Sequence, residues 1–282
     1  MNITEQREAV RFLVTHRVSV QRACVLVQLQ RATFRYQPRP LADDDVAGEL
    51  RALAQEQPRY GYRRMWALLR RKRVINAKRV HRLWKRAGLQ VQRTKHRQQR
   101  RERPVPVAAA YPRHVWAYDF VEDRDSHDTV LRILTVIDEF TREGLAIDVE
   151  LTTSAERVIS VLTQLVARHG APEYLRSDNG SEFVALAVQA WLAQREITTL
   201  YIDPGCPWQN GKDERFNGTL RDECLNMYLF VSVREARVRV EAFRRHYNEE
   251  RPHSRLGYQT PSEFKQAWYK SQANEPDSHI PT

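Results

Sequence analysis

The sequence predicts a mixed α/β domain with a five-stranded sheet, preceded by small all-helical segments. Three strand-like runs within residues 114–151 are separated by short turns, the pattern of an antiparallel meander. Amphipathic helices then alternate with two further short strand-like runs as far as residue 248, and this order favours a sheet flanked by helices. Residues 4–36 and 43–89 show only helical periodicity.

The first segment, residues 1–40, is predicted to hold three small helices. Ser19 precedes the second of them, and its hydroxyl can cap a helix N-terminus. The spacing is compatible with a helix-turn-helix, but a small helical core gives the same pattern. Both interpretations of this segment, DNA reading and simple packing, stay open.

The second segment, residues 41–89, is predicted to be a basic, helix-turn-helix-like DNA-binding region. Its first helix, at 43–57, ends before a proline. A second helix follows at 59–71, and Asn76 is the expected cap of a third at 77–89. One face of the third helix is apolar at helical spacing and is expected to be buried: Val80, Leu83, Trp84 and Ala87. The basic side chains outside it form the predicted DNA-contacting face: Lys78, Arg79, Arg82, Lys85 and Arg86.

Charge is distributed unevenly along the 282 residues, whose formal net charge is +11. Residues 51–104 hold 19 basic and 2 acidic side chains, whereas residues 105–282 hold 20 basic and 27 acidic ones. Such asymmetry is typical of a polyanion-binding module joined to a carboxylate-rich domain, although a solvated basic surface is the alternative. Residues 90–104 lack apolar periodicity and are predicted to be a basic linker.

Composition excludes several classes of protein. With 41% hydrophobic and 29% charged residues, the chain has the balance of a folded globular protein. No apolar run approaches the roughly 18–20 residues of a membrane span, and the N-terminus lacks a signal-peptide pattern, so we expect a cytoplasmic protein without a membrane partner. The distant cysteines Cys24, Cys206 and Cys224 do not indicate a disulfide framework or a cysteine-rich zinc site.

Acidic side chains near strand ends are candidate metal ligands, since Mg²⁺ prefers hard oxygen donors. Asp119 lies within the run at 114–123, where a carboxylate is costly to bury unless it is paired or bound to a metal. Asp178 ends a later strand, and Asn179-Gly180 forces a turn after it. Ligands bind at such carboxyl ends of strands in α/β sheets. The alternative for Asp119 is an ordinary surface residue, and the alternative for Asp178 is an ordinary turn.

Glu214 is the third candidate, on the helix that follows the last strand. Arg221 is seven positions further on and therefore only about 20° round the helix from it. Phe216 and Leu220 fall on the opposite face and are expected to pack on the sheet. Asp213, about 100° from Glu214, is interpreted as a residue of the first helical turn. Glu214, as a metal ligand, and Arg221, as a phosphate-binding cation, would then lie on one face of the helix. The alternative is an ordinary solvated helix face.

Seven local sequences and the spacing of the three acids carry a resemblance to a known family. These sequences are RYGYRRMWALLR, NAKRVHRLWKRAGL, WAYDF, TVIDEFTRE, RSDNGSEF, PWQNGKDERFNGTLRDECLN and YNEERPHSRLGYQTPSEF. Over roughly residues 40–268 the chain resembles the second reading-frame product of IS3-family insertion-sequence transposases. The 35 residues between Asp178 and Glu214 match the D,D(35)E pattern that these enzymes share with retroviral integrases.

The resemblance implies a ribonuclease H-like, integrase-type catalytic domain at residues 105–268. Residues 269–282, beyond the resemblance, are predicted to be a disordered tail. The resemblance implies that Asp119, Asp178 and Glu214 are the catalytic residues and metal ligands. Two Mg²⁺ ions are expected to bind there, with Mn²⁺ as a substitute. One ion would activate the attacking water or 3′-OH and the other would stabilise the leaving oxygen of an in-line displacement.

The resemblance also implies further residues and partners. Arg221 matches a basic, DNA-binding position, and Asn179 and Gly180 match the turn that supports the second aspartate. The expected reaction is DNA cleavage at the ends of an insertion sequence and joining of the freed 3′-OH to another phosphodiester. Expected partners are the terminal repeats, target DNA, further copies of the chain on DNA and the element's first reading-frame product, at a bacterial nucleoid. Unlike retroviral integrases, the sequence has no His-His-Cys-Cys zinc module.

Two other functions stay open on the sequence alone. A metal-dependent nuclease of the same fold would cut DNA without joining it, and strand transfer from a pre-cleaved end distinguishes that case. A regulator would bind DNA without catalysis. Asp119→Asn separates this second case, because only an enzyme would lose its reaction while it retains DNA binding.

Overall fold

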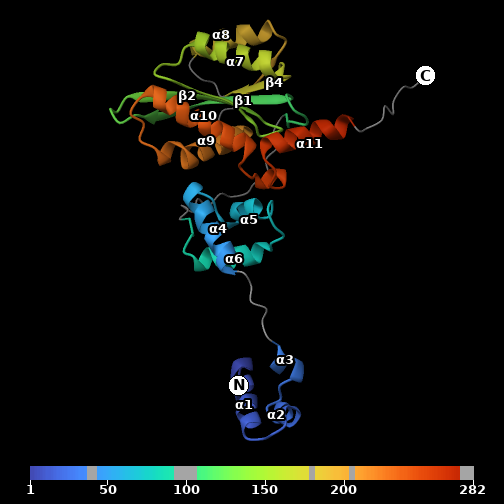
Figure 1. Cartoon of the computed structure of the whole chain (residues 1–282). Coiled ribbons are helices and arrows are strands. Elements are labelled where there is room, and N and C mark those ends of the chain that lie inside the picture. Colours follow the sequence, from blue (N-terminus) through green and yellow to red (C-terminus); the bar gives the residue numbers. More distant parts are fainter. Residues whose placement is uncertain (37–42, 92–106, 178–181, 203–206, 274–282) are drawn as a thin grey trace, which may run out of the picture. The chain divides into compact units, whose positions relative to one another are not determined.

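The computed structural model describes residues 1–36, 43–91, 107–177, 182–202 and 207–273 (Figure 1). The chain forms two compact units, Met1–Gly48 and Glu49–Thr282. The division into five segments that the sequence suggests stays a prediction. None of the helices in the described ranges is long and apolar enough to cross a membrane.

Three short helices form most of the first unit: α1 (Ile3–Thr15), α2 (Val20–Leu26) and α3 (Arg31–Arg35). The Ser19 hydroxyl accepts a hydrogen bond from the backbone N–H of Arg22 at 3.4 Å, which confirms the predicted cap. A small apolar core lies between the helices and consists of Val10, Ala23, Cys24 and Leu29. The three predicted helices are therefore confirmed.

Three helices precede the sheet: α4 (Asp43–Glu56), α5 (Tyr62–Leu69) and α6 (Ala77–Arg86). The Asn76 side chain accepts from the N–H of Lys78 at 2.8 Å, and Gly88, at φ 70°, follows the end of α6. The predicted stripe on α6 is buried at Val80, Leu83 and Trp84 and half-buried at Ala87. The amphipathic pattern thus correctly predicted which face of α6 is buried.

The sheet has five strands: β1 (Val115–Arg124), β2 (Val130–Asp138), β3 (Gly144–Glu150), β4 (Tyr174–Ser177) and β5 (Thr198–Tyr201). Their order is β3-β2-β1-β4-β5. The first three strands pair antiparallel, while β4 pairs parallel to β1 and β5 parallel to β4. The predicted five-stranded mixed sheet is confirmed.

Helices cover both faces of the sheet (Figure 1). The remaining helical elements are α7 (Ala155–His169), α8 (Glu182–Ala193), η1 (Pro207–Asn210), α9 (Gly211–Glu223), η2 (Leu225–Met227), α10 (Val233–Glu249), η3 (Ser254–Leu256) and α11 (Pro261–Ala273). The helix α11 continues to Ala273, so residues 269–273 are helical. The predicted disordered tail, 269–282, therefore begins too early in the sequence.

The alternation of side chains along β1 separates two cores. Trp116 and Tyr118 belong to the cluster under α7 and α8, whereas Ala117 and Val121 belong to the cluster under α9 and α10. Asp119 follows Ala117 at a spacing of two and therefore lies on the α9 face of the sheet. This register brings a carboxylate of the central strand to the helix that carries Glu214.

Candidate active site

A hydrogen bond joins Asp119 on β1 to the helix α9. The side-chain amide of Asn217 donates to Oδ2 of Asp119 at 2.9 Å, and the backbone N–H of Phe120 donates to Oδ1 at 2.8 Å. The Asp119 side chain is only half-buried. Both carboxylate oxygens are therefore oriented while the group stays accessible from solvent.

The sheet-facing side of α9 fixes the orientation of this helix. Phe216 and Leu220 are buried in the core against the sheet, as the sequence predicted. Asp213 lies in the first turn of α9, as the sequence predicted, and its side chain is fully buried. Seven positions separate Asp213 from Leu220, which places the two about 20° apart around the helix and explains the burial.

Glu214 lies three positions before Asn217 on α9 and is solvent-exposed. On an α-helix this spacing corresponds to about 60° of rotation and about 4.5 Å of rise. The flank of α9 that carries Glu214 therefore adjoins the residue that binds Asp119. The structure thus brings the element that carries the predicted third acid against the strand that carries the first.

Arg221 extends the same flank of α9 towards the end of β1. Its Nη2 donates to the backbone carbonyl of Glu122 at 2.8 Å, and its side chain is exposed. Arg221 therefore lies against β1, and a carbonyl of β1 fixes the position of its guanidinium.

Asp178, Asn179 and Gly180 lie outside the described residues. The described strand β4 ends at Ser177, and its register pairs Arg176 with Ala117 of β1. β4 therefore ends beside the strand that carries Asp119. Among the described residues, no group of three His, Cys, Asp or Glu side chains could hold a metal ion; the second predicted ligand is not among the residues searched.

A buried ion-pair network supports this end of the sheet, and sequence reasoning missed it. Nε of Arg176 lies 2.7 Å from Oε1 of Glu139, and Nζ of Lys212 lies 2.6 Å from Oε2 of the same carboxylate. Arg176 and Glu139 are both 1% exposed in their side chains. Burial lowers the pKa of Lys212, although the carboxylate of Glu139 opposes that effect. The network ties β4, the end of β2 and the start of α9 together.

The basic face predicted on α6 is largely accessible. Lys78, Arg82, Lys85 and Arg86 are exposed, whereas Arg79 is half-buried. Because Val80, Leu83 and Trp84 hold the opposite face in the helical core, the exposed cations point away from it. Their contact with DNA stays a prediction.

Sequence comparison places the chain among proteins of mobile elements. The family described as "Integrase core domain" matches residues 109–207 and 195–261, and an "HTH-like domain" matches residues 42–97. An insertion element IS476 protein of 39.2 kDa from Xanthomonas euvesicatoria is 40% identical over 95% of this chain and 79% of its own length. The transposase InsD of insertion element IS2 from Escherichia coli is 31% identical over 79% of this chain and 78% of its own length.

Comparison with solved structures supports the fold. The simian T-cell lymphotropic virus intasome, solved in complex with a PP2A regulatory subunit, contains a chain that resembles this one with a TM-score of 0.51. The two chains are 18% identical, and the match covers 74% of this chain and 70% of the viral one. The mixed sheet with helices on both faces is thus the ribonuclease H-like fold of integrase catalytic cores.

Proposed function

This chain belongs to the IS3 family of insertion-sequence transposases, and we propose that it cleaves DNA at the ends of its element and joins the freed 3′-OH to target DNA. The proposal assigns residues 105–268 to catalysis and residues 41–89 to DNA binding, with 90–104 as a basic linker. It names Asp119, Asp178 and Glu214 as the catalytic carboxylates, with Asn179 and Gly180 supporting the second.

One observation carries the proposal: the hydrogen bond from Asn217 to Asp119, at 2.9 Å. It links the strand of the first acid to the helix of the third, although 98 residues separate the bonded pair. The parallel pairing of β1 with β4 supports the second acid, because Asp178 directly follows Ser177 at the end of β4. Convergence of three carboxylates is what phosphoryl transfer with metal ions requires.

The described donor groups fit a divalent metal. Asp119 and Glu214 offer hard carboxylate oxygens, and neither side chain is fully buried, so water and phosphate oxygens could complete a coordination shell. When bound, a pair of divalent ions would activate the attacking oxygen and neutralise charge on the leaving one. Asn217 holds Asp119 in orientation, and Arg221 supplies a positive charge next to the reacting strand.

DNA is the partner that the charge distribution supports. The net charge of +17 over residues 51–104 and the exposed cations of α6 suit the phosphate backbone of terminal repeats and target DNA. Pairing of two element ends requires further copies of the chain, and the first reading-frame product is a second proposed partner. The relatives come from bacteria, so we place the reaction at the nucleoid in the cytoplasm.

A strand-transfer assay tests this function. The purified chain is incubated with labelled, pre-cleaved end DNA, a target duplex and Mg²⁺ or Mn²⁺, and the products are sized on a denaturing gel. We expect joined products from the wild-type chain and from the exposed-site control Asp128→Asn. Asp119→Asn should reduce joining about 10³-fold, because several kcal/mol of transition-state stabilisation depend on the ligand. Cutting without joining would indicate the nuclease, and unchanged transposition by Asp119→Asn would indicate the regulator.

A further inference from the structure

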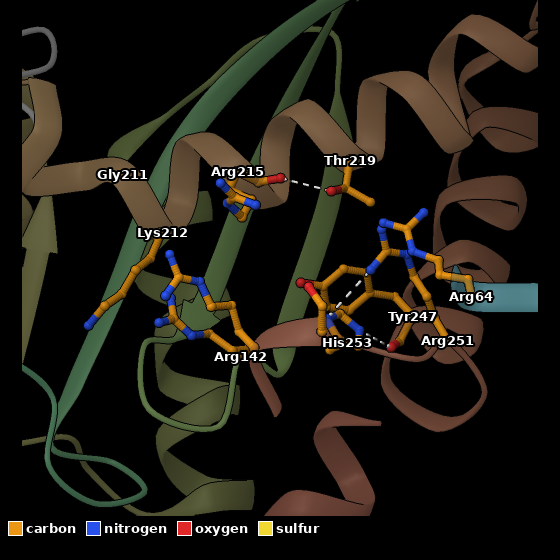
Figure 2. Close-up of a pocket in the computed structure, with 11 residues that line it drawn as sticks. Arg64, Arg142, Gly211, Lys212, Arg215, Thr219, Tyr247, Arg251 and His253 are labelled. Atoms are coloured by element: carbon orange, nitrogen blue, oxygen red, sulfur yellow. Dashed lines mark hydrogen bonds between the residues drawn. The ribbon is translucent and has the colours of Figure 1, made fainter. Parts of the chain in front are cut away.

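A cationic cavity of about 360 Å³ lies beside α9 (Figure 2). Gly211, Lys212, Arg215 and Thr219 of α9 form one side of it, and Arg142 reaches it from the turn between β2 and β3. Six further residues complete the lining: Arg64, Tyr247, Arg251, His253, Ser254 and Arg255. Side chains of α5, α9, α10 and the segment after α10 therefore meet at one hollow.

The lining of this cavity is one-sided in charge. Six of its eleven residues are Arg or Lys, and none of these described lining residues is acidic. Arg142, Arg215 and Arg255 form no ion pair with any residue in the described ranges. A solvent-accessible hollow with an excess of positive charge attracts an anion, because the anion offsets the repulsion between the like charges.

Neighbouring carboxylates do not neutralise the cavity. Glu223 accepts from both Arg64 and Arg251, at 2.8 Å and 2.6 Å. Glu139 is likewise shared, between Arg176 and Lys212. Each carboxylate thus binds two cations, and positive charge remains even after the pairs are formed.

Arg142 shows the consequence of this crowding. Burial lowers its pKa, and the positive charges of Arg255 and Arg215 lower it further. Arg251 also has His253 beside it, and burial together with Arg251 lowers the pKa of that imidazole to about 3. His253 is therefore neutral at pH 7. The positive charge of the cavity comes from its Arg and Lys side chains.

Two glycines of α9 lie beside Glu214, and one of them, Gly211, also lines the cavity. At 100° per residue, Gly211 and Gly218 fall on the outer surface of the helix, between the flank of Glu214 and the flank of Arg215 and Thr219. Both are exposed, and a Cβ added to either would meet nothing within 4 Å. Glycine within a helix is destabilising relative to alanine, so internal packing does not explain Gly218. A bare helix surface permits close approach of a ligand backbone.

We propose that the cavity lined by Arg142, Arg215, Arg251 and Arg255 binds a backbone phosphate of the DNA strand whose reacting phosphodiester lies at Glu214. The inference rests on the proposed function and adds a subsite to it. Guanidinium groups bind phosphate in bidentate geometry, and Gly211, at the N-terminal end of α9, adds the positive end of a helix dipole. The strand crosses α9 over the two glycines.

The helix diameter sets the expected position of this phosphate. An α-helix with its side chains is about 10–12 Å wide, and successive nucleotides of a DNA strand rise about 3.4 Å. A strand that crosses α9 therefore presents to the cavity a phosphate about three nucleotides from the reacting one. The prediction concerns a single phosphate position and can be tested chemically.

The test compares two variants that lose the same charge. The cavity variant is Arg142→Gln/Arg215→Gln/Arg255→Gln, and the control is Arg168→Gln/Arg234→Gln/Lys270→Gln, whose residues are exposed and outside the cavity. Binding of labelled end DNA is measured between 50 and 200 mM salt without metal, so that no strand is cut. We expect the cavity variant to bind about tenfold more weakly than the control, with a slope of log K against log[salt] that is smaller in magnitude by about 1.

A second arm locates the phosphate and controls for folding. Methylphosphonates, which remove the charge of one phosphate, are placed at successive positions of the end DNA. Those about three nucleotides from the cleavage site should weaken binding of the control but not of the cavity variant. The double variant Arg215→Gln/Arg255→Gln changes only exposed side chains and should show the same effect if the triple variant unfolds.

The outcomes separate this inference from the function. Equal affinity and salt slope for the cavity variant and the control would overturn the subsite, while strand transfer by the wild-type chain would still uphold the transposase. Failure of the wild-type chain to bind DNA or join strands would overturn both. If inorganic phosphate stabilises only the control against heat while DNA binding of the two is equal, the cavity binds a free anion and the DNA assignment is wrong.

Discussion

The amide nitrogen of Asn217 lies 2.9 Å from Oδ2 of Asp119, and this bond joins the central strand of the sheet to the helix above it. The neighbouring oxygen, Oδ1, accepts from the backbone N–H of Phe120. A carboxylate held at both oxygens cannot rotate freely. If Asp119 is a metal ligand, as proposed, Asn217 acts as its positioning residue.

Asn217→Ala tests that role. Loss of a residue that orients a metal ligand typically lowers metal affinity or activity 10–100-fold. We expect strand transfer to fall within about this range and the Mn²⁺ concentration for half-maximal activity to rise. The measurement is a metal titration of strand transfer, with the exposed Asn226→Ala as control. A variant with reduced activity but an unchanged metal requirement would show that Asn217 matters only for folding.

The exposed face of α6 should bind DNA phosphates. The variant Arg82→Gln/Lys85→Gln/Arg86→Gln removes three exposed charges and should lower the salt slope of DNA binding by up to about 3. Fluorescence anisotropy with end DNA at several salt concentrations measures this slope. The variant Arg168→Gln/Arg234→Gln/Lys270→Gln, with the same net charge, should leave the slope unchanged. Equal slopes for the two variants would contradict the assignment of α6.

The pair Arg176–Glu139 should stabilise the sheet end that precedes Asp178. Both side chains are 1% exposed, and removal of Arg176 breaks the buried pair and leaves Lys212 as the remaining cationic partner of Glu139. We expect Arg176→Gln to lower the free energy of unfolding by about 3–5 kcal/mol in urea titration. Addition of Glu139→Gln should recover part of that loss, and additivity of the two changes would argue against direct coupling.

Stability should depend on pH through His253. Its folded-state pKa is lowered to about 3, mainly by burial, whereas its ordinary value is 6.5. The unfolded chain therefore binds a proton below pH 6.5 that the folded chain does not bind, so stability is present at pH 7 and decreases as the solution is acidified. The slope reaches about 1.4 kcal/mol per pH unit. Urea unfolding at pH 7 and pH 4.5 should show a smaller pH dependence for His253→Gln, whereas the exposed His127→Gln should behave like wild type.

Periodicity predicted the elements of the fold because each is encoded locally. Hydrophobic spacing predicts the five strands and the packing of Phe216 and Leu220. Local hydrogen bonds between side chains and nearby backbone groups account for the caps at Ser19 and Asn76. The same spacing was available for Asp213. Its place in the first turn was predicted correctly, but its burial was not, although its angle on α9 matches that of Leu220.

The supports of the candidate site could not be predicted, because they join distant parts of the chain. Arg176 and Glu139 are 37 residues apart, and Asn217 and Asp119 are 98 apart. Asn217 carried a usable signal, since it lies one helical turn after Glu214. The sequence gives no signal for the cationic cavity, because Arg142 and Arg251 come together only when β2, β3 and α10 have packed.

The helix α9 has three distinct sides along its first three turns: one packs on the sheet, one carries Glu214 and one lines the cationic cavity. Most substitutions in such a segment should therefore impair packing or function. A saturation library of residues 211–221, selected for mobility of the element in living cells, should therefore yield few tolerated alleles. The exposed side of α7, by contrast, should accept most polar replacements. The pattern of tolerated substitutions would then show which positions of α9 serve packing, the site at Glu214 or the cationic cavity.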